Sequence, residues 1–155
     1  MVGAIEEPQS FSLARLQTMP QTSEVTRHDC VDGWSAIAKW SGVRLSSVLD
    51  IVRPRADARY VVFHCMDSDE RSVQYYESLD FGQARHPQVI LALRMNGAAM
   101  PIEHGAPVRL RVPTQLGYKS AKWIRRIQVV GAFASLYGGS GGYWEDQGYE
   151  WYAGI

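Results

Sequence analysis

Seven residues bounded by two prolines give the clearest structural signal in the chain. The segment Pro107–Pro113 reads PVRLRVP, so apolar and basic side chains alternate without a break. A period of two is typical of a β-strand with one buried face, because successive side chains point to opposite sides of the backbone. The opposite face should carry Arg109 and Arg111. The side chains that we expect to be buried are Val108, Leu110 and Val112.

Other segments also favour strands over helices. Asn96-Gly97 is the strongest two-residue hairpin signal in the chain, and it follows the apolar segment Gln88–Met95. A short amphipathic helix is predicted over Gly42–Val52 and another short helix over Glu77–Ala84. The sequence therefore predicts an α+β fold that is mixed, mainly antiparallel and rich in β-strand. The remaining strand candidates are Arg59–Cys65, Ser72–Tyr76 and Lys122–Val130.

The length of 155 residues fits one domain with a sizeable core. Residues 1–26 are polar and contain two prolines, so we expect an extended N-terminal arm there and the domain itself over residues 27–155. The glycine-rich tail over residues 138–155 carries five tyrosines and tryptophans, which need a surface on which to pack.

Charge and composition exclude several classes of protein. The formal net charge is zero, which gives no support for nucleic acid or an acidic membrane surface as a partner. Apolar runs such as Val129–Phe133 are too short to span a bilayer. The four histidines lack the spacing of a zinc hydrolase. No leader is recognised, so we expect a cytoplasmic protein, or a periplasmic one if a leader has been removed. A single disulfide between Cys30 and Cys65 stays open for an oxidising compartment.

The distribution of charge is more informative than its sum. No acidic residue lies between Glu103 and Glu145, and that stretch could form either a solvated basic face or an anion site. An anion site is favoured because two of its arginines lie on a short strand, and because the loop Gly117–Ser120 has backbone amides that could help to bind a phosphate. The basic residues of the stretch are Arg109, Arg111, Lys119, Lys122, Arg125 and Arg126.

Cys30 is a candidate ligand for a soft metal. Arg27 and His28 precede it, and nearby cations favour the thiolate that binds such metals. Asp29 and Asp32 partly cancel this positive field. A buried cysteine that packs as a small apolar side chain is the alternative.

Several linked motifs resemble those of the oxidoreductase molybdopterin-binding domain family of the sulfite oxidase type. The segment RHDCVDGW contains Cys30, and MNG is followed by HGAPVRL, which contains His104 and Arg109. The segment GYKSAKW contains Ser120 and Lys122, and the tail motifs GYW and GYEWY also match family members. The bacterial members that these motifs resemble include methionine sulfoxide reductase catalytic subunits. Family members carry a longer segment before the cysteine, and we identify no counterpart of that segment in residues 1–29.

The resemblance implies a role for each matching position. Cys30 would be the catalytic residue and the thiolate ligand of the metal in Mo-molybdopterin. Cys65 would line the pocket at a position where the reductase has threonine. The reaction implied is oxygen-atom transfer to or from a small oxyanion or sulfoxide, with an external electron-transfer partner. The residues expected to bind the cofactor are His104, Arg109, Ser120, Ala121, Lys122 and Cys65.

Two rival functions stay open at this point. The domain could be a non-enzymatic pterin-binding module with an incomplete site, or a metal-free enzyme that uses Cys30 as nucleophile and His28 or His104 as base. The metal-site hypothesis predicts that Cys30 lies at the floor of a cleft lined by His104, Arg109 and Lys122. It also predicts that Cys65 lies nearby at a strand end.

Overall fold

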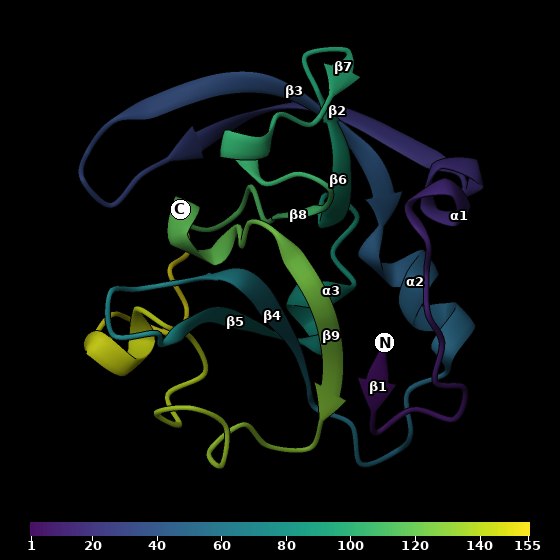
Figure 1. The fold of residues 1–155 in the computed structure, drawn as a ribbon, viewed down its shortest axis with the longest axis vertical. Coiled ribbons are helices and arrows are strands. Elements are labelled where there is room, and N and C mark those ends of the chain that lie inside the picture. Colours follow the sequence, from purple (N-terminus) through teal and green to yellow (C-terminus); the bar gives the residue numbers. More distant parts are fainter.

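The computed structural model describes residues 1–155 and contains two β-sheets (Figure 1). The first sheet has the strand order β1-β9-β4-β5, in which only β1 and β9 run parallel. In chain order its strands are β1 (Val2–Gly3), β4 (Tyr60–Ser68), β5 (Gln74–Asp80) and β9 (Ile124–Val130).

The second sheet is antiparallel throughout. It has the order β2-β3-β6-β7, and β8 also pairs with β6. The β2–β3 hairpin extends beyond the rest of this sheet, and its turn lies on the same side of the molecule as the C-terminus (Figure 1). The predicted α+β, mainly antiparallel fold is therefore confirmed. The strands are β2 (Gln21–Asp29), β3 (Ser35–Arg44), β6 (Ile90–Met95), β7 (Ala98–Ala99) and β8 (Arg109–Arg111).

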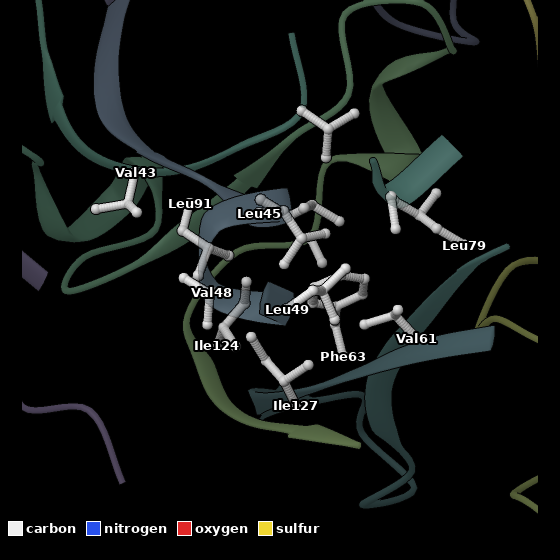
Figure 2. Close-up of a cluster of buried hydrophobic side chains, with 14 of the residues drawn as sticks. Val43, Leu45, Val48, Leu49, Val61, Phe63, Leu79, Leu91, Ile124 and Ile127 are labelled. Atoms are coloured by element: carbon white, nitrogen blue, oxygen red, sulfur yellow. The ribbon is translucent and has the colours of Figure 1, made fainter. Parts of the chain in front are cut away.

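One helix supplies much of the core that joins the sheets. Helix α2 (Leu45–Val52) buries Leu45, Val48 and Leu49 against apolar side chains of both sheets (Figure 2). These positions recur at helical spacing, which gives the helix one continuous apolar stripe. None of the helices is long and apolar enough to cross a bilayer. The other helices are α1 (Leu13–Thr18), α3 (Phe81–Ala84), and the single turns η1 (Ile102–His104), η2 (Gly117–Lys119) and η3 (Glu145–Gln147).

The two strongest local signals are confirmed. Met95 pairs with Ala98 across the two-residue turn, and Asn96 and Gly97 both have positive φ, as a type I′ turn requires. Leu110 and Val112 are fully buried, whereas Val108 is only partly buried. The two arginines of the same strand are also buried, so neither face of β8 is a solvent face.

Two helix predictions need correction. Residues 77–80 continue β5, and the helix begins only at Phe81, where Asp80 and Gln83 form a capping box. Residues 42–44 are the last residues of β3, so the helix that was predicted over Gly42–Val52 begins only at Leu45. In both cases pairing with a neighbouring strand overrides the local pattern.

Residues 1–26 are not irregular. β1 pairs with β9, Ile5 is completely buried, and β2 begins at Gln21 and continues through the expected boundary after residue 26. The strand β2 was not predicted, because the side chains on its inward face include the polar Glu24 and Thr26. The strand therefore lacks the alternation of apolar and polar residues by which strands are recognised.

Candidate functional site

A cavity of about 610 Å³ lies between the β2–β3 hairpin, the loops that contain η1 and η2, and the C-terminal segment. A smaller cavity of about 250 Å³ beside α1 is lined mostly by apolar residues. The larger cavity is the candidate site because it collects the charged and sulfur-containing side chains. The sequence-predicted residues on its wall are Cys30, His104, Arg109, Ser120 and Lys122.

Cys30 lies in the turn that joins β2 to β3 and is partly exposed. Its N–H donates to the Trp34 carbonyl at 2.9 Å, and its own carbonyl accepts from Gly33 at 3.0 Å, so backbone bonds close the turn around it. The Sγ atom lies 3.5 Å from Oδ2 of Asp32. The thiol is therefore held at the cavity wall, reachable by a ligand, with one carboxylate beside it.

Arg109 is a buried cation that has no acidic partner. It is 7% exposed, its Nη1 donates to the His104 carbonyl at 3.1 Å, and its guanidinium lies 5.0 Å from the ring centre of Trp40. Its Nε is buried without a hydrogen-bond partner, and burial lowers the pKa of Arg109 to about 10. A buried charge is costly unless it is paired, so this wall of the cavity favours an anion.

Lys122 adds a second cation to the same wall. Its side chain and that of Arg109 both pack against Gly105, where an added Cβ would lie 3.0 and 3.1 Å from their Cβ atoms. The backbone N–H groups of Ala121 and Lys122 donate to no protein acceptor. Ala121 itself is buried behind the wall, and its carbonyl accepts from Leu110 at 2.8 Å. Lys122 therefore brings an ammonium to the cavity, where its Nζ donates to the Glu103 carbonyl at 3.2 Å.

The structure reveals a second buried arginine that ties three parts of the site together. Arg111 is 1% exposed, and its Nη1 donates to Nδ1 of His28 at 2.7 Å and to Oγ of Ser120 at 3.2 Å. Its Nη2 donates to Oγ1 of Thr26 at 3.3 Å. Arg111 thus joins β2, which leads to Cys30, to the loop that contains Ser120.

His28 is a poor general base in this setting. Burial and the neighbouring Arg111 lower the pKa of His28 to about 4. Neither His28 nor His104 hydrogen-bonds to Cys30, whose Sγ contacts Asp32 instead. The geometry therefore gives no support to the metal-free enzyme that would use Cys30 as nucleophile.

Cys65 does not line the cavity, which corrects the expectation that it contacts the cofactor. It is 0% exposed within β4 and belongs to the main hydrophobic cluster, and burial raises the pKa of its thiol. Asp67, two residues further along β4, lines the cavity instead. Cys30 and Cys65 are both free thiols.

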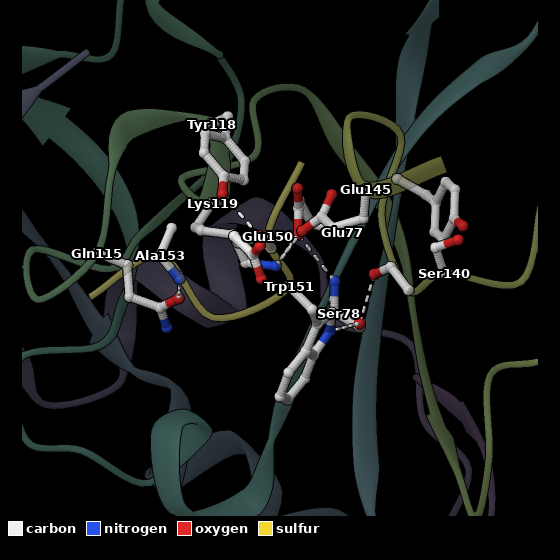
Figure 3. Close-up of polar contacts among 12 residues, drawn as sticks. Glu77, Ser78, Gln115, Tyr118, Lys119, Ser140, Glu145, Glu150, Trp151 and Ala153 are labelled. Carbon is white, nitrogen blue, oxygen red and sulfur yellow. Dashed lines mark hydrogen bonds and ion pairs between the residues drawn. The ribbon is translucent and has the colours of Figure 1, made fainter. Parts of the chain in front are cut away.

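The acid-free stretch divides into parts with different roles, and Lys119 is not part of the anion site. Its ammonium is fully buried between Glu77, at 2.6 Å, and Glu145, at 2.5 Å (Figure 3). Arg125 and Arg126 are exposed and donate to Gln74 and Gln128. The sequence could not show this division, because the partners of Lys119 lie far from it along the chain.

The aromatic tail packs on the domain, as its composition predicted, and it also completes the cavity wall. Trp144 and Tyr149 line the cavity, and their rings stack with centres 5.2 Å apart. The segment is fixed by polar bonds to β5: Nε1 of Trp151 donates to Oγ of Ser78 at 2.9 Å, and the hydroxyl of Tyr76 donates to Asp146 at 2.7 Å (Figure 3 shows the first).

A substitution at Gly117 should disturb the site directly. A Cβ at this position would lie 2.5 Å from Nε2 of His28, so Gly117→Ala requires the η2 loop or the ring to move. We expect a loss of about 1–3 kcal/mol in the free energy of unfolding, measured by urea denaturation. Gly82→Ala is the matched control, since its Cβ would have one neighbour within 4 Å, Oδ1 of Asp80 at 3.3 Å. Equal stability of the two variants would contradict the close packing of His28 on Gly117.

Comparison with known proteins identifies relatives of this chain. The model of the oxidoreductase molybdopterin binding domain matches residues 1–135. The chain is 43% identical over 152 residues to a protein of Azospira oryzae named as protein-methionine-sulfoxide reductase subunit YedZ1, and 35% identical over 139 residues to the protein-methionine-sulfoxide reductase catalytic subunit MsrP of Ralstonia nicotianae. These matches cover 98% and 83% of this chain, but only 53% and 42% of the two relatives, so the chain spans about half their length.

A solved structure has the same fold. The sulfane dehydrogenase SoxCD from Paracoccus pantotrophus superposes with a TM-score of 0.74 at 24% identity, covering 84% of this chain and 37% of that one. The shared fold, the match over most of the chain and the two relatives identify the family. The chain belongs to the oxidoreductase molybdopterin binding domain family, of the sulfite oxidase type.

Proposed function

We propose that this domain is the molybdopterin-dependent part of an oxidoreductase that transfers an oxygen atom to or from a sulfoxide or a small oxyanion. The observation that carries the proposal is the presence of one accessible thiol, Cys30, in the same cavity as Arg109 and Lys122. A soft metal needs the thiolate, and a phosphorylated cofactor needs the cations.

The residues of the cavity fit such a cofactor. The buried Nε of Arg109 has no partner within the protein, and the amides of Ala121 and Lys122 are also unpartnered. These donors suit a phosphate. Cys30 would hold the metal, and His104 and Ser120 would contact the pterin or its phosphate from the same wall. Cys65 has no part in this proposal.

Bound molybdopterin supplies the two-electron exchange of an oxygen atom at the metal. The chain supplies position and electrostatics. Arg109 and Lys122 attract negative charge, and the rings of Trp144 and Tyr149 screen part of the cavity from water. An external partner would supply two electrons for the reduction of a sulfoxide, or accept two electrons from the oxidation of an oxyanion. We propose a cytoplasmic location, or a periplasmic one if a leader is removed, and cell fractionation would distinguish the two.

A sulfoxide is the substrate that the rim of the cavity favours. Trp34, Trp144 and Tyr149 line the cavity and expose 53%, 38% and 38% of their surface. Such rings suit an apolar side chain with one polar oxygen better than a hydrated oxyanion. The relatives named as protein-methionine-sulfoxide reductases support the same class. Turnover of an oxidised, unfolded polypeptide should exceed that of sulfite, and the reverse order would favour the oxyanion.

Removing the buried cation should empty the site without unfolding the domain. Arg109→Ala should lower the affinity for molybdopterin by about tenfold or more, because a hydrogen bond to a charged group contributes about 1.5–3 kcal/mol. The measurement is pterin and molybdenum content after expression in a cofactor-sufficient host, with the melting temperature as the check on folding. Arg125→Ala, at an exposed position outside the cavity, is the control. Full cofactor content in Arg109→Ala would contradict the proposed site.

The second candidate is a pterin-binding module without activity. Two measurements distinguish such a module from an enzyme. They are the ratio of molybdenum to protein and the rate at which a sulfoxide is reduced with an artificial electron donor. Stoichiometric metal without turnover of any sulfoxide or oxyanion would favour the binding module.

A further inference from the structure

His28 occupies a defined place between Cys30 and the anion loop. It is the residue of β2 that lies two positions before Cys30, and it lines the cavity. One side of its ring faces Trp34, with ring centres 5.8 Å apart, and its Nε2–Cε1 edge packs on Gly117. The ring is therefore held in one orientation by packing on two sides.

The hydrogen bond from Arg111 decides which ring nitrogen carries the proton. A guanidinium has donors only, so the Nδ1 atom that lies 2.7 Å from Arg111 must accept and cannot be protonated. The proton of the ring is then on Nε2. This nitrogen bonds to no protein atom and is not among the buried unpartnered atoms. The Nε2–H, at the edge beside Gly117, is therefore the one donor of the ring that the protein leaves without an acceptor.

Arg111 cannot easily give up this bond. It is 1% exposed, and its guanidinium lies 4.5 Å from the ring centre of Trp40. Nη1 also reaches Ser120, and Nη2 reaches Thr26 and the Arg27 carbonyl, whereas Nε is already buried without a partner. No carboxylate pairs with it. Loss of the bond to His28 would leave a buried donor unsatisfied, which is costly.

We propose that His28 is a further binding residue of this cavity, which donates its Nε2–H to the oxyanion bound beside Arg109 and Lys122. Arg111 is the positioning residue that fixes the donor nitrogen. The oxyanion is either the phosphate of the cofactor or an anionic substrate, since both present the same acceptor. This inference rests on the proposed anion site but not on the oxygen-transfer reaction.

The tautomer is tested by nuclear magnetic resonance on the chain purified without cofactor. Long-range ¹H–¹⁵N correlation of the imidazole should show the proton of His28 on Nε2, with Nδ1 unprotonated. The signal is assigned by its loss in His28→Gln. Arg111→Lys, which keeps the charge but not the fork of donors, should give a mixture of tautomers if it folds. A proton on Nδ1 in the unaltered protein would overturn the proposal.

Binding is tested with inorganic phosphate as the probe, by calorimetry on the same cofactor-free chain. His28→Asn places no donor near the Nε2 position, and we expect about tenfold weaker binding. His28→Gln places its amide near that position and should bind within about threefold of the unaltered protein. Equal binding by His28→Asn and the unaltered protein would overturn the proposal.

A parallel titration of Arg109→Ala separates the two levels of inference. If Arg109→Ala binds phosphate normally, the proposed anion site is wrong. If Arg109→Ala loses binding and His28→Asn does not, only the role of His28 is wrong. In cofactor-loaded protein, a lower pterin content of His28→Asn identifies the cofactor phosphate as the acceptor. An unchanged content with a higher KM for sulfite identifies the substrate.

Discussion

Cys30→Ser should abolish oxygen transfer in cofactor-loaded protein, with a loss of at least about 100-fold, because even outer contacts of a metal site cost 10–100-fold when removed. Serine keeps the size of cysteine and can hydrogen-bond, but it is a poor replacement for a thiolate on a soft metal. The turn that holds Cys30 is closed by backbone bonds, which the substitution leaves intact. The measurement is sulfoxide reduction with an artificial electron donor, together with molybdenum content.

Cys65→Ser is the matched control, and it should fail in a different way. Cys65 is completely buried among apolar side chains and does not line the cavity. A hydroxyl at this position should therefore lower the stability of the domain and leave its oxygen-transfer activity unchanged. We expect a loss of about 1–3 kcal/mol in the free energy of unfolding for a buried hydroxyl without a partner. Activity measured well below the melting temperature should be retained. Full activity in Cys30→Ser would end the proposal that this thiol binds the metal.

Lys119→Met should be the most destabilising single substitution considered, at about 3–5 kcal/mol, because removal of one partner leaves buried charge uncompensated. The ammonium lies between two carboxylates that are themselves completely buried, Glu77 and Glu145. Burial and the Glu145 carboxylate raise the pKa of Glu77 despite the nearby ammonium. Glu77 therefore keeps its proton at pH values above those at which a glutamic acid side chain usually ionises. Without Lys119, nothing in this cluster offsets the remaining negative charge.

Urea denaturation measures this effect, and Arg85→Met is the control. Arg85 also pairs with a carboxylate, Asp50, but both side chains are largely exposed, and surface pairs contribute about 1 kcal/mol or less. Because Glu145 holds the C-terminal segment, Lys119→Met should also increase proteolysis of residues 138–155 more than Arg85→Met does. A loss of stability no larger than that of the surface pair would show that the buried cluster does not anchor the tail.

The sequence predicted local structure correctly where a pair of residues or a short alternating repeat is enough to determine it. The positive φ of Asn96 and Gly97 and the buried Leu110 follow from chemistry within a few residues. The helix expected over residues 77–84 forms only from Phe81, because residues 77–80 continue β5 and Glu77 is buried against Lys119. The strand β2 was missed because its inward side chains include polar residues that are bonded to Arg111.

The sequence by itself determined the fold class, the family and five of the 21 residues that line the cavity, because linked motifs fix residue types at positions where the backbone must turn, pair or accept a ligand. Tertiary structure alone decided which charges serve the cavity. Arg109 and Lys122 face it, Lys119 turns to two buried carboxylates, and Cys65 is sealed in the core. The physical reason is that the cost of a buried charge depends on its partners. The partners lie tens of residues away along the chain, as Glu77 does from Lys119 and His28 from Arg111. They meet only when the sheets and the C-terminal segment pack together.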